Sequence, residues 1–218
     1  MKRKILIAGL DSKLKAKLVK LFINNNFTVA VSVNNKELPP DNKNNNLIEI
    51  PWNIKSPLSA KNLILECQHK LNGFDEALVI LSSQHSNKPI HEILSSDIEY
   101  AIDISLKGNI FLLKELILYF QNVKTGNISL VHNSPQSKIF APLYAASAGG
   151  LAELTKSLFA SYQNEQLTIN SFMSGSELIE EYAEYIFHNI SGRTKKLHGK
   201  ILRFQDKLHP FSFTSQKR

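Results

Sequence analysis

The sequence contains one cysteine and no long apolar run, and each absence excludes a class of protein. The lone Cys67 excludes an internal disulfide and a multi-cysteine metal site, and it fits a reducing compartment. No stretch reaches the roughly 20 apolar residues that a membrane span requires. The first apolar run ends at Asp11, which is too short for a secretory signal and better suits a strand. We therefore expect a cytoplasmic protein without a membrane partner.

Metal-binding patterns are missing as well. The histidines have neither the helical pairing nor the neighbouring carboxylates that are typical of zinc ligands. They are His69, His85, His91, His132, His188, His198 and His209. The sequence therefore predicts no metal site.

The net charge of +7 lies entirely at one end of the chain. Residues 193–218 contain eight Lys or Arg and one Asp, so residues 1–192 are neutral in sum. A solvated basic tail over residues 207–218 is the simpler interpretation, and nucleic acid is then not an expected partner. The alternative is a tail that binds a polyanion.

Short β-branched runs alternate with helix-length amphipathic segments along the 218 residues. This alternation predicts an α/β fold with a parallel sheet, and the length suits a single domain. The expected strands are 4–8, 28–33, 47–51, 77–82, 127–131, 167–172 and 200–204. The expected helices are 12–25, 57–71, 97–121, 144–162 and 176–190.

Five segments in one order resemble the short-chain dehydrogenase/reductase family, and the resemblance runs over residues 4–204. They are the long interface helix ("KGNIFLLKELILYF"), the strand before the active-site serine ("GNISLVHNS"), the tyrosine helix ("LYAASAGGLAELTKSLFASY"), the next strand and turn ("LTINSFMSG") and the closing strand ("GKILRF"). The resemblance implies a Rossmann-like, doubly wound parallel sheet in a single domain, residues 1–206. The chain resembles a divergent member, because its cofactor and catalytic motifs are changed.

The family binds NAD(P) at a glycine-rich turn after the first strand, where bare backbone approaches the pyrophosphate. Here Gly9 keeps the first glycine, whereas Lys13 and Lys15 replace the next two. Long side chains in that space disfavour the usual cofactor pose, since a partly exposed charge pair worth about 0 to 1 kcal/mol does not offset an overlap. Two alternatives remain: a lysine-lined anion site, and an exposed face of Lys13, Lys15 and Lys17, which is the simplest interpretation. We expect no NADP or NAD, or only weak binding.

The other cofactor positions that the resemblance implies are changed too. The end of the second strand lacks the acid that accepts from the ribose hydroxyls, and Lys36 there slightly favours NADP. Asn53 stands for an Asp that contacts the adenine amine, and its carbonyl oxygen can still accept that bond. The turn after the fourth strand reads "ILSS", with Ser82 and Ser83 in its second half, instead of the family's Asn-Asn-Ala-Gly.

The family's hydride-transfer site uses a tyrosine, a lysine, an asparagine and a serine. The matching positions here are Tyr144, Ala148, Ser105, and Asn133 or Ser134. A phenol with a pKa of about 10 is protonated at neutral pH, so the missing lysine removes the tuning of the acid rather than the acid itself. Tyr144 is interpreted more simply as a packed residue that makes a local hydrogen bond.

Two further features bear on catalysis. Lys138 or a protonated His132 is a candidate for the missing cation, although both are expected to be loop residues. The mobile lid that covers the substrate in the family is absent, because Gly175 leads almost directly into the helix expected at 176–190. Without a lid, water is not excluded from a hydride-transfer site.

These features predict a catalytically impaired pseudo-oxidoreductase that acts as a scaffold or regulatory subunit. Its partner is a second copy, in a homodimer or homotetramer through helices 97–121 and 144–162, or an active relative in a hetero-oligomer. The alternative is an NAD(P)H-dependent oxidoreductase that reduces a carbonyl or oxidises a hydroxyl, with Tyr144 as the proton donor.

Overall fold

Seven parallel strands form one sheet within residues 2–34, 45–81, 88–133, 141–192 and 197–205, which are the residues that the computed structural model describes. The strand order is β3-β2-β1-β4-β5-β6-β7. The strands are β1 (Lys4–Gly9), β2 (Thr28–Val33), β3 (Leu47–Pro51), β4 (Glu76–Leu81), β5 (Gly126–Asn133), β6 (Leu167–Ser174) and β7 (Ile201–Phe204). The predicted doubly wound sheet is confirmed.

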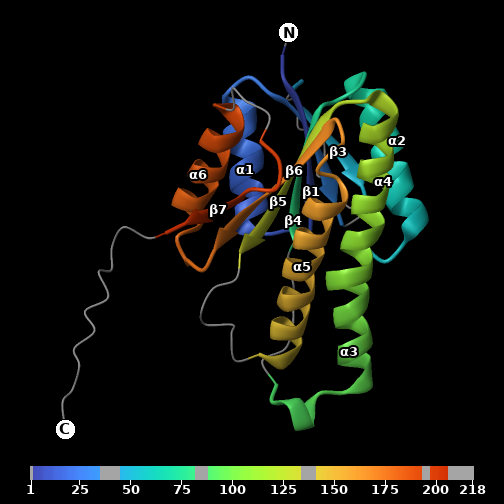
Figure 1. Cartoon of the computed structure of the whole chain (residues 1–218), viewed down its shortest axis with the longest axis vertical. Helices are drawn as coiled ribbons and strands as arrows, with labels where there is room; N and C mark the ends of the chain where they lie inside the picture. Colours follow the sequence, from blue (N-terminus) through green and yellow to red (C-terminus); the bar gives the residue numbers. More distant parts are fainter. Residues whose placement is uncertain (1, 35–44, 82–87, 134–140, 193–196, 206–218) are drawn as a thin grey trace, which may run out of the picture.

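Helices cover both faces of the sheet, with α1 and α6 on one side and α2, α4 and α5 on the other (Figure 1). Their bounds are α1 (Lys13–Asn24), α2 (Pro57–Leu71), α4 (Gly108–Val123), α5 (Pro142–Ser161) and α6 (Ile179–Ser191). A 3-10 turn (η1, Ile90–Glu92), a short helix (α3, Ser95–Ala101) and a π-helical segment (η2, Ile102–Lys107) precede α4. The helix predicted at 97–121 is therefore a continuous helical column of three segments, in which a π-helical segment separates two α-helices.

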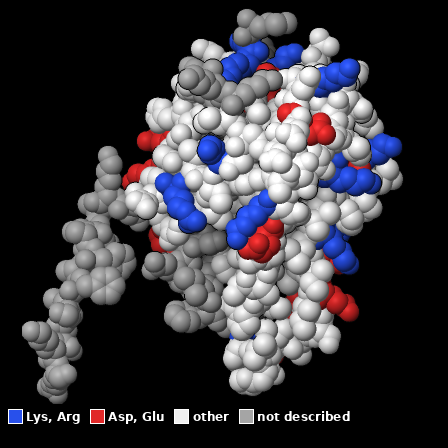
Figure 2. All heavy atoms as spheres, viewed as in Figure 1, with Lys and Arg blue, Asp and Glu red and all other residues white. Residues whose placement is uncertain are grey.

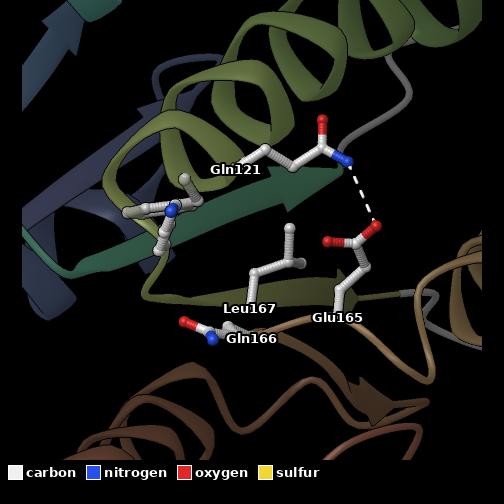
Figure 3. A pocket seen from close by; sticks show the side chains of 6 residues that line it. Gln121, Glu165, Gln166 and Leu167 are labelled. Atoms are coloured by element: carbon white, nitrogen blue, oxygen red, sulfur yellow. Dashed lines mark hydrogen bonds between the residues drawn. The ribbon is translucent and has the colours of Figure 1, made fainter.

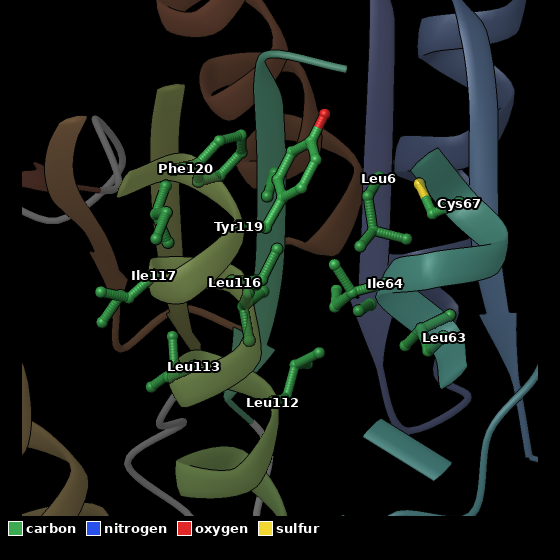
Figure 4. Close-up of a cluster of buried hydrophobic side chains, with 14 of the residues drawn as sticks. Leu6, Leu63, Ile64, Cys67, Leu112, Leu113, Leu116, Ile117, Tyr119 and Phe120 are labelled. Carbon is green, nitrogen blue, oxygen red and sulfur yellow. The ribbon is translucent and has the colours of Figure 1, made fainter. Parts of the chain in front are cut away.

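Two apolar layers hold the helices to the sheet. On one face, α2 and α4 bring leucine, isoleucine and aromatic side chains against Leu6 and its neighbours (Figure 4). On the other face, Phe22, Phe27 and Phe187 meet edge to face between α1, β2 and α6. No helix in the described part of the chain is long and apolar enough to cross a membrane.

Gly9, at the carboxyl end of β1, allows the close approach of β1 and β4. Its φ is +144°, and a Cβ atom there would lie 2.6 Å from the carbonyl oxygen of Ile80. Any larger residue would be strained by its backbone angle and would also overlap β4. Because all strands are parallel, this edge also carries the carboxyl ends of β2, β5 and β6, where α/β proteins bind ligands.

The connection from β6 to α6 is four residues long, from 175 to 178. It is folded tightly, because Ser174 Oγ accepts from Ser176 N at 3.0 Å and Ser176 Oγ accepts from Leu178 N at 2.9 Å. No lid segment is inserted here, as the sequence predicted.

Candidate active site

The predicted site residues lie at the carboxyl edge of the sheet in two groups. Gly9, Lys13 and Lys15 stand at the junction of β1 and α1, and the group around Tyr144 stands at the junction of β5 and α5. Lys36, Ser82, Ser83, Ser134 and Lys138 lie outside the described residues.

Lys15 points inward, contrary to the exposed lysine face that the sequence suggested. Only 3% of the Lys15 surface is exposed to solvent, whereas Lys13 is exposed and Lys17 is half-buried. The Lys15 ammonium donates to Gly9 O at 2.9 Å, to Asp11 Oδ1 at 2.8 Å and to Ser32 O. Ser32 Oγ lies 3.3 Å from the same nitrogen. The expectation of an exposed Lys15 was wrong because the ends of β1 and β2 supply an oxygen cage for its charge.

The surroundings of Lys15 act on its pKa in opposite directions. Burial lowers the pKa below the ordinary lysine value, while Asp11 and, more weakly, Glu49 oppose that effect. The Ser12 hydroxyl caps the start of α1 by accepting from Lys15 N at 3.1 Å. Both the backbone and the side chain of Lys15 thus fix this turn.

Asn53 makes a turn before α2. Its Oδ1 accepts from Lys55 N at 3.1 Å, and its backbone N–H donates to Ser59 Oγ at 2.8 Å. The side-chain oxygen that was expected to meet an adenine amine therefore already closes a local turn. An oxygen with a second lone pair can still accept another bond.

Tyr144 lies in the first turn of α5 and is 5% exposed. Its hydroxyl donates to the backbone carbonyl of Asn133 at 3.2 Å, across the loop that joins β5 to α5. One turn later, Ala148 is half-buried and offers no cation. The prediction that Tyr144 packs at a helix start and makes a local hydrogen bond is confirmed.

A second tyrosine, which the sequence reasoning missed, reaches the preceding carbonyl from the other face of the sheet. Tyr182 of α6 is fully buried and donates from its hydroxyl to His132 O at 2.8 Å. Burial raises the pKa of Tyr182 above its ordinary value. Tyr144 and Tyr182 therefore hold consecutive carbonyls at the end of β5 from opposite faces.

His132 is a buried strand residue rather than a loop residue. Its Nε2 lies 3.1 Å from Thr155 Oγ1, and that hydroxyl donates to Leu151 O at 2.9 Å. Nε2 therefore carries the hydrogen, because the threonine oxygen is left to accept. Burial lowers the pKa of His132 to about 4, so the ring is neutral near pH 7. His132 does not replace the missing lysine as a cation.

Ser105 lies inside the π-helical segment and is fully buried. The side chain of Asn109, one turn later, donates to the Ser105 carbonyl at 2.6 Å. Asn109 therefore ties the start of α4 to the π-helical segment through a side-chain donor. Sequence periodicity identified Asn109 only as part of a helix.

Two hollows lie away from this edge. One, of about 310 Å³, is near the amino end of β6, where Gln121 and Glu165 face each other and are joined by a 3.4 Å hydrogen bond (Figure 3). The other, of about 250 Å³, is an apolar groove between α4 and α5. The described residues contain no group of three or more His, Cys, Asp or Glu that could hold a metal ion.

Comparisons with known proteins agree with this architecture. A family model described as short chain dehydrogenase matches residues 3–178. ElxO with NADP bound has a similar structure, with a TM-score of 0.78 at 15% identity over 93% of this chain and 97% of that chain. A serine dehydrogenase from Escherichia coli gives 0.77 at 13% identity over 92% and 96% of the two chains. A short chain dehydrogenase from Bacillus anthracis gives 0.77 at 15% identity over 93% and 95%.

Proposed function

Because the chain belongs to the short-chain dehydrogenase family, we propose that it keeps the family's NAD(P)-binding fold but has lost the usual oxidoreductase site, and that it acts as a scaffold or regulatory subunit. The observation that carries this proposal is the Tyr144 hydroxyl, which donates to Asn133 O while Ala148 stands at the lysine position. General acid-base help is worth about 10²- to 10⁴-fold and requires a group with a matched pKa that reaches the reacting atom. Position 148 supplies no lysine beside Tyr144, and the tyrosine hydroxyl donates to the backbone carbonyl of Asn133.

The four-residue connection after β6 supports the same conclusion. A lid excludes water and positions substrate, and residues 175–178 are too few and too tightly bonded to each other to do so. These are independent changes in different elements, and each weakens hydride transfer. Together they favour loss of the activity over an altered specificity.

The face formed by α3, η2, α4 and α5 is the proposed docking surface. Apolar side chains that are 40% to 46% exposed follow the helical column, namely Ile98, Ile102, Ile110 and Leu118. The apolar groove beside them is lined by Ile110, Leu113, Lys114, Ile117, Leu118, Gln121, Leu154, Leu158 and Tyr162. The first half of α5 carries no charged residue, and its end of the molecule is largely white in Figure 2. A second copy of the chain, or an active relative, would cover this surface.

Sedimentation velocity tests the docking surface. Ile110→Asp places a charge in the groove, and Leu58→Asp is the control, since Leu58 is 65% exposed on α2. We expect the wild type and the control to form dimers or tetramers and Ile110→Asp to be monomeric. A monomeric wild type, together with no complex recovered from its own cells, would remove the scaffold proposal.

A reductase with Tyr144 as proton donor is the second candidate. The observation that favours it is Asn133 Oδ1, a buried acceptor for which the described residues supply no hydrogen-bond partner, on the residue that Tyr144 contacts. A substrate hydroxyl could donate to that oxygen. Reduction of a panel of carbonyl compounds with NADPH or NADH, lost in Tyr144→Phe, would establish this activity instead.

Polyanion binding through the basic tail stays a separate prediction. On the face shown in Figure 2, the lysine and arginine side chains of the described residues are interspersed with acidic ones and form no continuous basic patch. Binding to phosphates would weaken steeply with salt. If full-length protein and a variant that lacks residues 207–218 bind a DNA duplex equally poorly at low salt, this idea is discarded.

A further inference from the structure

Lys15 has a buried ammonium group whose hydrogen bonds join the ends of β1 and β2 at the candidate site. Its three hydrogens are matched by three acceptors: the carbonyls of Gly9 and Ser32 and the carboxylate of Asp11. Ser32 Oγ completes the arrangement, because it accepts from Gly9 N at 3.2 Å and donates to Gly9 O at 3.3 Å. The Lys15 ammonium and the Ser32 hydroxyl therefore link the end of β1 to the end of β2, through bonds to main-chain atoms of Gly9 and Ser32.

The position of this cage matters for the cofactor. The family leaves position 15 to a glycine and uses the end of the second strand to contact ribose hydroxyls. The Lys15 backbone stands at the glycine position of the turn after β1. Its ammonium reaches the end of β2, because it bonds to Ser32, the penultimate residue of that strand. The side chain therefore crosses the space between the ends of β1 and β2.

Displacing this side chain would be unfavourable. A buried charge is tolerated only where partners satisfy it, and removing one partner leaves the others buried and unpaired. A dinucleotide in the usual pose would have to expel the Lys15 side chain and remove the ammonium bonds to the carbonyls of Gly9 and Ser32, of which, among the described residues, only Gly9 O keeps a side-chain donor, Ser32 Oγ. The phosphates of a dinucleotide only accept hydrogen bonds and each ribose hydroxyl offers one donor, whereas the Lys15 ammonium offers three donors to the same cage.

We propose that Lys15 is an internal ligand, which occupies the ribose end of the dinucleotide crevice and joins β1 to β2 in the absence of any cofactor. The inference rests on the proposed function, because it gives the physical reason why the fold persists without the nucleotide. Lys15 thus acts as a built-in block of the site rather than as a phosphate-binding residue.

Three full-length variants test the proposal, with NADPH as the probe. Lys15→Ala empties the crevice, Lys15→Met keeps most of its bulk without the charge, and Lys13→Ala changes the exposed lysine two residues earlier. We expect Lys15→Ala to lower the melting temperature by roughly 5 to 10 °C and to gain NADPH binding that the wild type lacks. Lys15→Met should lose stability without gaining binding, and Lys13→Ala should match the wild type in both measurements.

Hydrogen exchange on the wild type keeps the proposal testable if Lys15→Ala does not fold. The amides at the ends of β1 and β2 should be protected without nucleotide, and millimolar NADPH should not change their protection. The proposal is overturned if Lys15→Ala folds without gaining NADPH binding, or if NADPH increases protection at those amides in the wild type. Failure of the docking proposal is read separately, from the oligomeric state of Ile110→Asp, which leaves Lys15 unchanged.

Discussion

Two regions of the molecule differ in how their side chains are used. They are the carboxyl edge of the sheet, where polar side chains bond to the backbone, and the face of α3, η2, α4 and α5, where apolar side chains stay exposed. At the edge, the ammonium of Lys15 donates to backbone carbonyls of β1 and β2. The hydroxyls of Tyr144 and Tyr182 donate to backbone carbonyls of β5. On the helical face, Ile98, Ile102, Ile110 and Leu118 stay partly exposed beside an apolar groove. Under the proposed function, donors that already bond to the backbone are not available to a nucleotide, whereas an exposed apolar face gains stability when another protein covers it. This comparison is the reason why the proposed function is assigned to the helical face.

The largest expected effect is a loss of folding stability at a glycine of the carboxyl edge, compared with a glycine of the helical face. Gly9→Ala puts a Cβ atom 2.6 Å from Ile80 O at a φ of +144°, so it should lower the free energy of unfolding by about 3 kcal/mol or more. Gly149→Ala adds a methyl group on α5 with nothing within 4 Å, so it should be neutral or stabilising by up to about 1 kcal/mol. Urea denaturation measures both. Similar losses at the two positions would contradict the assignment of Gly9 to a close strand contact.

The second effect is a pH dependence that arises at the edge. The pKa of His132 falls from 6.5 to about 4 on folding, so below pH 6.5 the unfolded chain binds a proton that the folded chain does not. Stability is therefore lost as the pH falls from 6.5 to 4, by about 3 kcal/mol at 1.4 kcal/mol per pKa unit. The control is His132→Gln, which can donate to Thr155 at every pH. Its unfolding free energy should change less over this interval, and an equal pH dependence in both proteins would exclude His132 as the cause.

The third test compares the two tyrosines. Tyr182→Phe leaves the buried carbonyl of His132 without its donor and should cost about 1 to 3 kcal/mol of stability. Tyr144→Phe removes a longer bond closer to the surface and should cost about 1 kcal/mol. Chemical denaturation of both variants gives the order. If Tyr144→Phe were neutral in stability and abolished a measurable NADPH-dependent reduction, Tyr144 would be a catalytic residue.

The smallest effect on folding is expected on the helical face. Ile110→Asp changes a residue that is 46% exposed, so the free energy of unfolding of the isolated subunit should stay within about 0.5 kcal/mol of the wild type. The oligomer should nevertheless dissociate. A variant that lost more than that in stability while remaining oligomeric would show that Ile110 belongs to the core of the subunit.

The elements of the fold could be predicted from the sequence because each has a strong local pattern. The strand predicted at 28–33 and the helix predicted at 57–71 match β2 and α2 at both ends, and Ser56 followed by Pro57 marks the start of α2. The π-helical segment at 102–107 was missed, since its apolar residues keep nearly the helical spacing.

The candidate site was less predictable, because its contacts join distant segments. The direction of Lys15 depends on Ser32, 17 positions later, and Lys13 has the same local signals without such a partner. Tyr182 looked like one more apolar position of a helix, and only the packing of α6 on the sheet brings it to His132. Tyr144 was found because the resemblance identified its position, and its bond within the β5–α5 connection is local.

Calorimetric titration of the full-length wild-type protein with NADPH and NADH tests the central claim most directly, namely that Lys15 and Tyr144 bond to the backbone of the carboxyl edge and that no nucleotide binds there. We predict no binding heat at millimolar nucleotide. Saturable binding at micromolar concentration, followed by transfer of hydride to a carbonyl compound and loss of that transfer in Tyr144→Phe, would contradict the account.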